Sequence, residues 1–348
     1  MQPTRPVQTS VAIEDVTRLE ERGLLQRVIA NQSFWVTLTV ALICLATAWY
    51  EPETFPTRDN FFNITRNFAP IGIMAMGMTA VILTRGIDLS VGSMMALVGI
   101  STARLLEAGF PWWVATGAGL AIGLAAGGVN GALVAYVKLP PFVVTLGTLS
   151  IFRSLAVVLS ENRIIYDFGE SGDVFKELGG GQVGFPWYDG TTLYLSNQFL
   201  VLVVLALLFG FVFRAVPWGR HLYAIGGNEQ AAQLTGIPVD RIKLQAYMIC
   251  GLTTAIAALL LTGYNGSASN GMGRTWELYV IAAAVIGGTN LMGGEGGAYG
   301  GFIGAALIFL IRNSLIMFGV EANWYDLFVG LFIILAVLLE RIRGRSRG

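Results

Sequence analysis

The sequence predicts an all-α fold, a polytopic membrane bundle of about ten transmembrane helices with a short polar helix between the sixth and seventh spans. Of its 348 residues, 54% are hydrophobic and 13% are charged, and the mean hydropathy is +0.64. These values place the chain outside the soluble globular class. Ten apolar runs suit a hydrocarbon core about 30 Å thick. The formal net charge of zero argues against a nucleic-acid-binding surface, which needs a cationic excess.

The predicted membrane domain covers residues 34–340, between an N-terminal tail at 1–33 and a basic C-terminal tail at 341–348. The N-terminal tail mixes acidic and basic residues and lacks the apolar core and cleavage site of a signal peptide. The longest loop, at 161–196, is polar and glycine-rich. The spans are expected at 34–50, 68–83, 91–106, 112–137, 142–160, 198–216, 244–263, 278–286, 298–318 and 324–339.

Two spans carry distinctive local sequences. The third follows RGIDLSVG, in which Asp88 and Ser90 are expected to cap the helix start; for Asp88, capping is favoured over contact with a ligand. The fourth carries six glycines between positions 117 and 131, and this density lets helix backbones approach closely, so we expect it in the bundle interior. Cys44 and Cys250 lie in apolar runs and are expected to act as small hydrophobic residues, not as a disulfide or metal pair.

The placement of Lys and Arg predicts the orientation. An even number of spans puts both termini on one face. If that face is inside, fourteen Lys and Arg residues lie inside and six outside, and Arg153 and Arg312 lie within spans. Because basic residues are retained on the cytoplasmic side, we expect both termini and the segment 217–243 to face the cytoplasm.

The segment 217–243 is the longest polar, helix-competent stretch between two apolar runs. A helix is expected from Glu229 to Thr235, with Asn228 as its N-cap, Glu229 in the first turn and Gly236 as its stop. Pro238 prevents continuation, and Asp240 is expected to cap the next helix. A short helix held between two spans needs a soluble partner. We expect Ala231 and Ala232 to form the face that contacts this partner, because small side chains permit close approach.

Four blocks of the chain resemble known permeases. NEQAAQLTGI looks like the "EAA" loop of ABC importer permeases. GIDLSVGSMMALVG, PPFVVTLGTLSIFRSLA and IAAAVIGGTNLMGGEGGAYGGFIGA resemble the ribose/xylose-type sugar permease family, within the branched-chain amino-acid and simple-sugar permease superfamily. The resemblance covers about 61–339. The chain departs from the importer motif at Gln230, where Glu more commonly precedes the two alanines.

This resemblance implies a permease subunit of an ATP-driven importer in a bacterial inner membrane, which moves a simple sugar such as ribose, xylose or galactose into the cytoplasm. It implies a second permease copy, two ATP-binding cassette subunits and a solute-binding protein as partners, besides membrane lipid. The residues expected to couple the chain to the ATPase are Asn228, Glu229, Ala231, Ala232, Gly236 and Ile237.

The residues independently point to an external energy source. None of the three lysines follows a glycine, so no phosphate-binding P-loop is expected, and ATP hydrolysis is assigned to a partner. The chain is therefore not expected to be an enzyme or to bind a cofactor. No Asp or Glu falls in the middle of a predicted span, whereas secondary carriers usually place ionisable groups there. A branched-chain amino-acid permease and, from another class, a secondary carrier or channel remain the alternatives.

Two arginines and a glycine-rich turn need separate interpretation. Arg153 and Arg312 lie toward the outer ends of their spans, where snorkelling to the interface is favoured. The alternative is that both line a polar substrate pathway with Asn313. The turn GGTNLMGGEGG is interpreted as a tight structural re-entry in preference to a phosphate site.

Overall fold

The computed structural model describes residues 31–186, 191–325, 327–328, 330–331 and 334. The predicted C-terminal tail, most of the N-terminal tail and most of the tenth predicted span lie outside these residues. The helices, in chain order, are α3 (Gln32–Tyr50), α4 (Arg58–Leu83), α5 (Val91–Glu107), α6 (Trp112–Ala135), α7 (Pro141–Ser160), α8 (Gly172–Gly180), α9 (Asn197–Ala215), α10 (Pro217–Gly227), α11 (Glu229–Leu234), α12 (Val239–Asn265), α13 (Trp276–Ile286) and α14 (Ala298–Met317). Short 3₁₀ turns, η1 (Gly169–Ser171) and η2 (Ala322–Trp324), complete the helical elements.

The chain forms a polytopic helical membrane bundle, as the composition predicts. Seven of the described helices are long and apolar enough to cross a membrane, namely α3, α4, α6, α7, α9, α12 and α14. Two predicted spans correspond to shorter helices, since α5 has 17 residues and α13 has 11. The total of ten spans therefore stays a prediction.

Two polar segments expected as loops contain regular structure. Helix α4 begins at Arg58, ten residues before the predicted span, because the Thr57 side chain accepts from Asn60 N and caps its first turn. The predicted loop 161–196 contains α8 and an antiparallel hairpin of β1 (Gln182–Pro186) and β2 (Thr192–Ser196). Helix α8 forms because it buries Phe175 against Phe168 and the end of α12.

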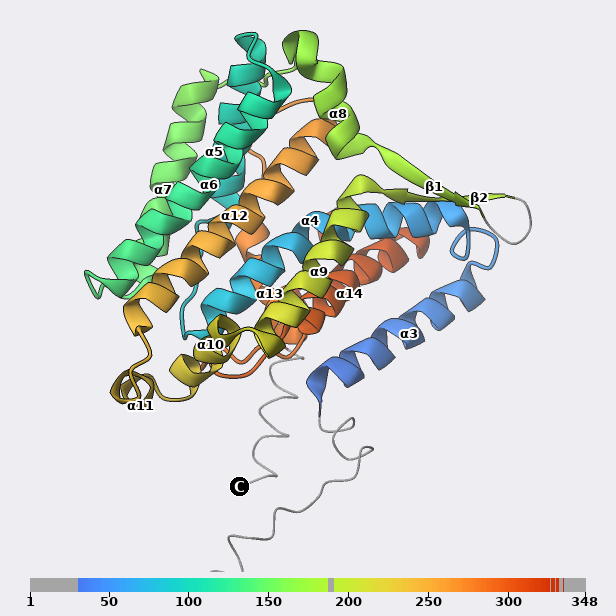
Figure 1. Cartoon of the computed structure of the whole chain (residues 1–348). Coiled ribbons are helices and arrows are strands. Elements are labelled where there is room, and N and C mark those ends of the chain that lie inside the picture. Colours follow the sequence, from blue (N-terminus) through green and yellow to red (C-terminus); the bar gives the residue numbers. More distant parts are fainter. Residues whose placement is uncertain (1–30, 187–190, 326, 329, 332–333, 335–348) are drawn as a thin grey trace, which may run out of the picture.

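Helices α4 and α12 form the centre of the bundle (Figure 1). Every residue of α4 from Phe68 to Leu83 is buried. Helix α12 packs against α4, α5, α6 and α8, while α14 packs against α3, α4 and α13. Helix α7 lies on the outside of α5, and α3 lies at the opposite edge of the bundle (Figure 1).

The glycines of α6 have different surroundings. A Cβ at Gly123, Gly127 or Gly131 would collide with the backbone of α12, whereas Gly117 has open space around it. Close approach of α6 and α12 therefore explains the first three glycines. The opposite face of α6, with Val129 half exposed, is uncovered, so the predicted interior position holds for one face only.

The bundle has two distinct ends. The α11 end contains α10, α11, the α4–α5 link (84–90) and the turn at 287–297. The hairpin end contains α8, the hairpin, the starts of α4, α9 and α13, and the ends of α12 and α14. Figure 1 shows α10 and α11 at the bottom and α8 at the top.

Candidate functional site

Helix α11 has the N-terminal cap that the sequence predicts. The Oδ1 atom of Asn228 accepts from Ala231 N at 3.0 Å, and Glu229 occupies the first turn. An N-cap of this kind contributes about 1 kcal/mol to a helix. The six-residue helix Glu229–Leu234 ends one residue before the predicted boundary.

The C-terminal stop of α11 is also as predicted. Gly236 has φ of +84°, the left-handed region that favours glycine. Gly236 N donates to Gln233 O at 3.0 Å and Ile237 N donates to Ala232 O at 3.1 Å, which is the Schellman hydrogen-bond pattern. Both ends of α11 are thus closed by local hydrogen bonds, which makes the helix stiff.

The two alanines of α11 face different ways. Ala232 is 4% exposed and packs into the bundle, whereas Ala231 is exposed. The predicted contact face is therefore wrong for Ala232. Leu234 is 89% exposed, and its place on the outer face was missed because the sequence does not tell which side of a short helix is covered.

Two ion pairs reach the start of α12, one from α11 and one from the link between α6 and α7. Lys243 Nζ contacts Glu229 Oε2 at 2.7 Å. Asp240 pairs with Lys138, from the link between α6 and α7. The sequence predicts Asp240 as the N-cap of α12, and this prediction is wrong. Pro238 is the N-cap, and Asp240 lies in the first turn of the helix. A negative side chain in the first turn still interacts favourably with the helix dipole.

Helix α10, which the sequence analysis did not identify, ends in a tightly packed junction. Arg85 Nε donates to Gly226 O at 2.8 Å and Arg85 Nη2 donates to Gly227 O at 2.9 Å. Gly294 N donates to Leu83 O at 3.1 Å, and a Cβ at Gly226 would collide with both of these groups. We call the contact of Arg85 with Gly226, Gly227 and the 287–297 turn the Arg85 junction. Its residues connect α4, α10 and α14, and Arg85 itself holds a φ of 63°, which is uncommon for a non-glycine residue.

The glycine-rich turn at 287–297 is a close-packed link between α13 and α14. Gly288, Gly293, Gly294 and Gly296 all have positive φ. Tyr223 of α10 donates its hydroxyl to Gly296 O at 2.9 Å. Burial raises the pKa of the Tyr223 hydroxyl above its ordinary value, which keeps this donor protonated. These contacts agree with the structural interpretation of the turn.

Asp88 is more deeply buried than a loop capping residue. Its Oδ1 accepts from Ser90 N at 2.9 Å and from Ser90 Oγ at 2.6 Å. Asn130 Nδ2 of α6 donates to Asp88 Oδ2 at 3.3 Å. Asp88 therefore orders the turn before α5. It does not cap the helix as predicted, because Ser90 is the N-cap and Asp88 accepts from Ser90 and not from an amide of α5; the Ser90 side chain makes no cap hydrogen bond either.

Arg153 is separated from the other two pathway candidates. Its Nη1 donates to Asn270 O at 2.5 Å and to Met272 O at 2.9 Å. It thereby holds the α12–α13 loop against α7. Arg153 does not line the cavity that contains Arg312 and Asn313, so the structure does not bring the three candidates together; its snorkelling to the membrane interface stays a prediction.

Arg312 and Asn313 do lie together, in a cavity of about 390 Å³ at the hairpin end. We call it the hairpin-end cavity. Asn313 Nδ2 donates to Asn60 Oδ1 at 2.9 Å, and the Arg312 guanidinium lies 5.5 Å from the Tyr325 ring centroid. The lining residues come from the starts of α4, α9 and α13, the ends of α12 and α14, and the segment after α14.

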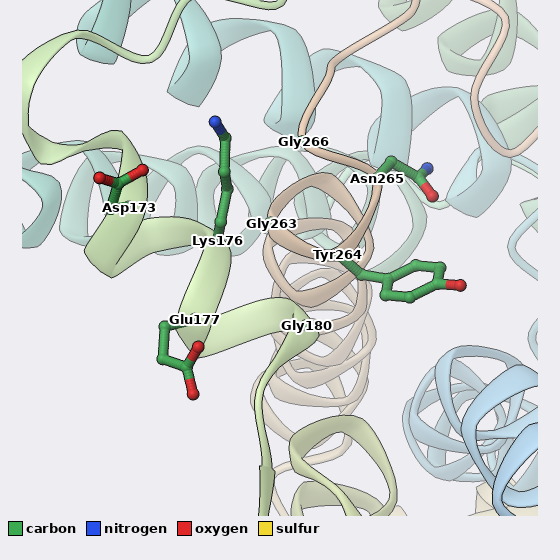
Figure 2. A pocket seen from close by; sticks show the side chains of 8 residues that line it. All are labelled: Asp173, Lys176, Glu177, Gly180, Gly263, Tyr264, Asn265 and Gly266. Carbon is green, nitrogen blue, oxygen red and sulfur yellow. The ribbon is translucent and has the colours of Figure 1, made fainter.

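A second, open hollow of about 670 Å³ lies beside it. Figure 2 shows Asp173, Lys176 and Glu177 on α8 along one side, and Tyr264 and Asn265 at the end of α12 on the other. Tyr264 and Asn265 line both hollows. Among the described residues, no group of three or more His, Cys, Asp and Glu could hold a metal ion.

Comparison with known proteins identifies the family. Residues 60–338 match the family model described as "Branched-chain amino acid transport system / permease component". The ribose import permease protein of Haemophilus influenzae is 36% identical over 312 residues, 88% of this chain and 93% of that protein. The D-allose transport system permease protein of Escherichia coli is 34% identical over 304 residues, 87% of this chain and 90% of that protein.

The fructose import permease protein of Rhizobium meliloti is 34% identical over 281 residues, 80% of this chain and 76% of that protein. No solved structure matches. The family match covers four of every five residues and includes α11 and the Arg85 junction. The chain therefore belongs to the ABC-transporter permease family described as the branched-chain amino acid transport system permease component.

Proposed function

We propose that the chain is the membrane-spanning subunit of an ATP-driven importer that moves a simple sugar into the cytoplasm. The observation that carries the coupling role is α11, a helix closed at both ends that exposes Leu234. The similarity to permeases named for ribose, allose and fructose import supports the sugar assignment. ATP is hydrolysed by a separate ATP-binding cassette subunit, and this chain contributes no catalytic residue.

In this proposal α11 docks in the ATPase subunit and transmits its motion. Asn228 and Gly236 keep the helix short and stiff, and Ile237 extends the Schellman pattern. Ala231 lies in the docking face, while Ala232 seats α11 against the bundle. Glu229 transfers the movement to α12 through Lys243. The Arg85 junction gives α10 a second connection, to α4 and α14.

The proposed assembly has two permease copies, two ATPase subunits and a solute-binding protein, in the inner membrane with both chain termini in the cytoplasm. The α11 end then faces the cytoplasm and the hairpin end faces outward, where the binding protein delivers its sugar. The excess of basic residues on the α11 side supports this orientation.

Co-purification of the ATPase subunit tests the coupling role. Gly236→Val forces a β-branched residue into φ of +84°, which costs about 1 kcal/mol or more, and Ala232→Trp places a large ring at a buried position. Both variants are expected to insert in the membrane and to lose the ATPase subunit. Gln233→Ala is the matched control on the exposed face. Retained ATPase association and transport in both bulky variants would contradict the coupling role.

Uptake into proteoliposomes that contain the complete complex tests the substrate and the energy source. We expect uptake of D-ribose, D-allose or D-fructose when ATP is supplied to the ATPase subunits, and no uptake when ATP is omitted. The description of the family model favours branched-chain amino acids as a second candidate, so L-leucine is measured in parallel. Uptake of L-leucine alone would replace the sugar assignment, and uptake without ATP would indicate a secondary carrier or channel.

A further inference from the structure

The hairpin-end cavity has the size and lining of a small-molecule site. Its volume of about 390 Å³ falls in the range of about 300–1,000 Å³ that is typical of ligand pockets. Its walls combine aromatic rings with amide and guanidinium groups, and its lining includes Arg66, Tyr264, Trp276, Tyr279, Arg312 and Asn313. Flat rings with a few convergent polar groups are typical of such pockets.

Two lining side chains carry buried polar atoms without a partner among the described residues. Asn313 Oδ1 accepts no hydrogen bond although its Nδ2 is bound to Asn60. Arg66 Nε donates none, while its Nη2 donates to Asn63 Oδ1 at 2.8 Å. An unsatisfied buried polar group costs about 1–3 kcal/mol. Both atoms are shielded from solvent, so a ligand hydroxyl, which can both donate and accept, reaches them only after the two side chains rotate toward the cavity.

The charge of the lining indicates the class of ligand. Two arginines and several amide side chains line the cavity, and no carboxylate does among the described residues. An amino acid could pair its carboxylate with an arginine, but its ammonium group would remain without a counter-charge beside two cations, which is costly away from water. A neutral polyhydroxy compound meets no such penalty, since its hydroxyls can accept from the guanidinium and amide groups.

The open hollow and the hairpin-end cavity are neighbours that share two lining residues. Tyr264 and Asn265 line both spaces, and Figure 2 shows their side chains projecting from the end of α12. The Arg66 guanidinium carbon lies 4.6 Å from the centroid of the Tyr264 ring. This cation–π contact positions Tyr264 at the boundary between the two spaces.

We propose that the hairpin-end cavity binds a monosaccharide directly, as the first site that the sugar occupies within the permease. The exposed Arg312 guanidinium donates to a sugar hydroxyl, and the rings of Trp276 and Tyr279 cover the apolar face of the sugar. Rotation of the Asn313 and Arg66 side chains on binding lets two further hydroxyls satisfy Asn313 Oδ1 and Arg66 Nε. This inference rests on the proposed sugar transport and adds a site for the sugar in this chain.

Binding to the purified full-length permease in lipid nanodiscs, without ATPase or binding protein, tests the proposal. Ligand-observed NMR titrations use D-ribose, D-allose, D-fructose, D-ribose 5-phosphate and L-leucine. We expect at least one neutral sugar to bind and L-leucine to give no signal. Preferential binding of the phosphorylated sugar would overturn the neutral assignment, and absence of binding by all three neutral sugars would overturn the site.

Variants locate the binding. Asn313→Leu and Arg312→Ala are each expected to weaken sugar binding about tenfold, the loss expected for one hydrogen bond to a charged or buried group. Arg312→Lys keeps the charge but not the planar fork, so it should also bind more weakly than wild type. The control is Arg163→Ala, which removes an exposed arginine bound to Glu107 outside the cavity. Variants are compared only where size-exclusion profile and thermal unfolding match wild type.

The complete transporter separates failure of the site from failure of the proposed function. ATP-driven sugar uptake with an unchanged KM in Arg312→Ala and Asn313→Leu, together with unchanged binding, would overturn the cavity site and leave the transport function intact. Wild-type complexes that take up none of the three sugars would overturn the proposed function itself. A raised KM in both variants with an unchanged KM in Arg163→Ala supports the site.

Discussion

Leu234→Ser is expected to weaken the association of the permease with its ATPase subunit. The Leu234 side chain is 89% exposed at the end of α11, so nearly all of it is available for burial by a partner. Full burial of a leucine side chain contributes about 1.5–3 kcal/mol. Losing about 2 kcal/mol raises the Kd about 30-fold. Biolayer interferometry with the permease in nanodiscs and the ATPase subunit in solution measures this change.

The same measurement includes two controls. Gln233→Ala changes an exposed neighbour on α11 without removing apolar surface, and its Kd is expected within about twofold of wild type. Thermal unfolding of Leu234→Ser should match wild type, because an exposed side chain contributes little to stability. A Kd for Leu234→Ser within twofold of wild type would refute the assignment of this face of α11 to the ATPase.

Three further predictions concern packing, coupling and orientation. Gly127→Ala should lower the thermal unfolding temperature because its Cβ meets the α12 backbone, whereas Gly128→Ala, whose Cβ has only a side-chain atom at 3.7 Å, should not; equal effects would contradict the close seam. Arg85→Ala removes two hydrogen bonds to α10 carbonyls and should lower the sugar moved per ATP hydrolysed while ATPase binding persists; an unchanged ratio would exclude the Arg85 junction from coupling. In intact cells, an impermeant maleimide should label Ser171→Cys and not Ser346→Cys, which lies outside the described residues; the reverse pattern would invert the topology.

Local chemistry was sufficient to predict several features of this protein. Hydropathy identified the membrane bundle, since apolar runs of sufficient length are recorded directly in the chain. The ends of α11 followed from Asn228 and Gly236, because caps depend on side chains and φ angles within a few residues. The motif blocks likewise predicted the permease family, which the comparisons confirm.

Other features depended on which surfaces meet. Ala232 and Leu234 are both apolar and two residues apart, so nothing in the sequence distinguishes the covered side chain from the exposed one; the position of α11 against the bundle decides this. The two arginines within spans also looked alike in sequence. The fold attaches Arg153 to the carbonyls of the α12–α13 loop and leaves Arg312 in a cavity.

The hairpin-end cavity is the clearest example of a feature that the sequence alone does not predict. Arg66 and Asn313 lie 247 positions apart in the sequence and share a cavity because α4 and α14 pack side by side. Whether their polar atoms are buried without a hydrogen-bond partner depends on neighbours that only the folded chain brings together. The sequence by itself determined the class, the family and the local ends of helices, while the tertiary structure decided burial, partners and cavities, because these depend on contacts between distant segments.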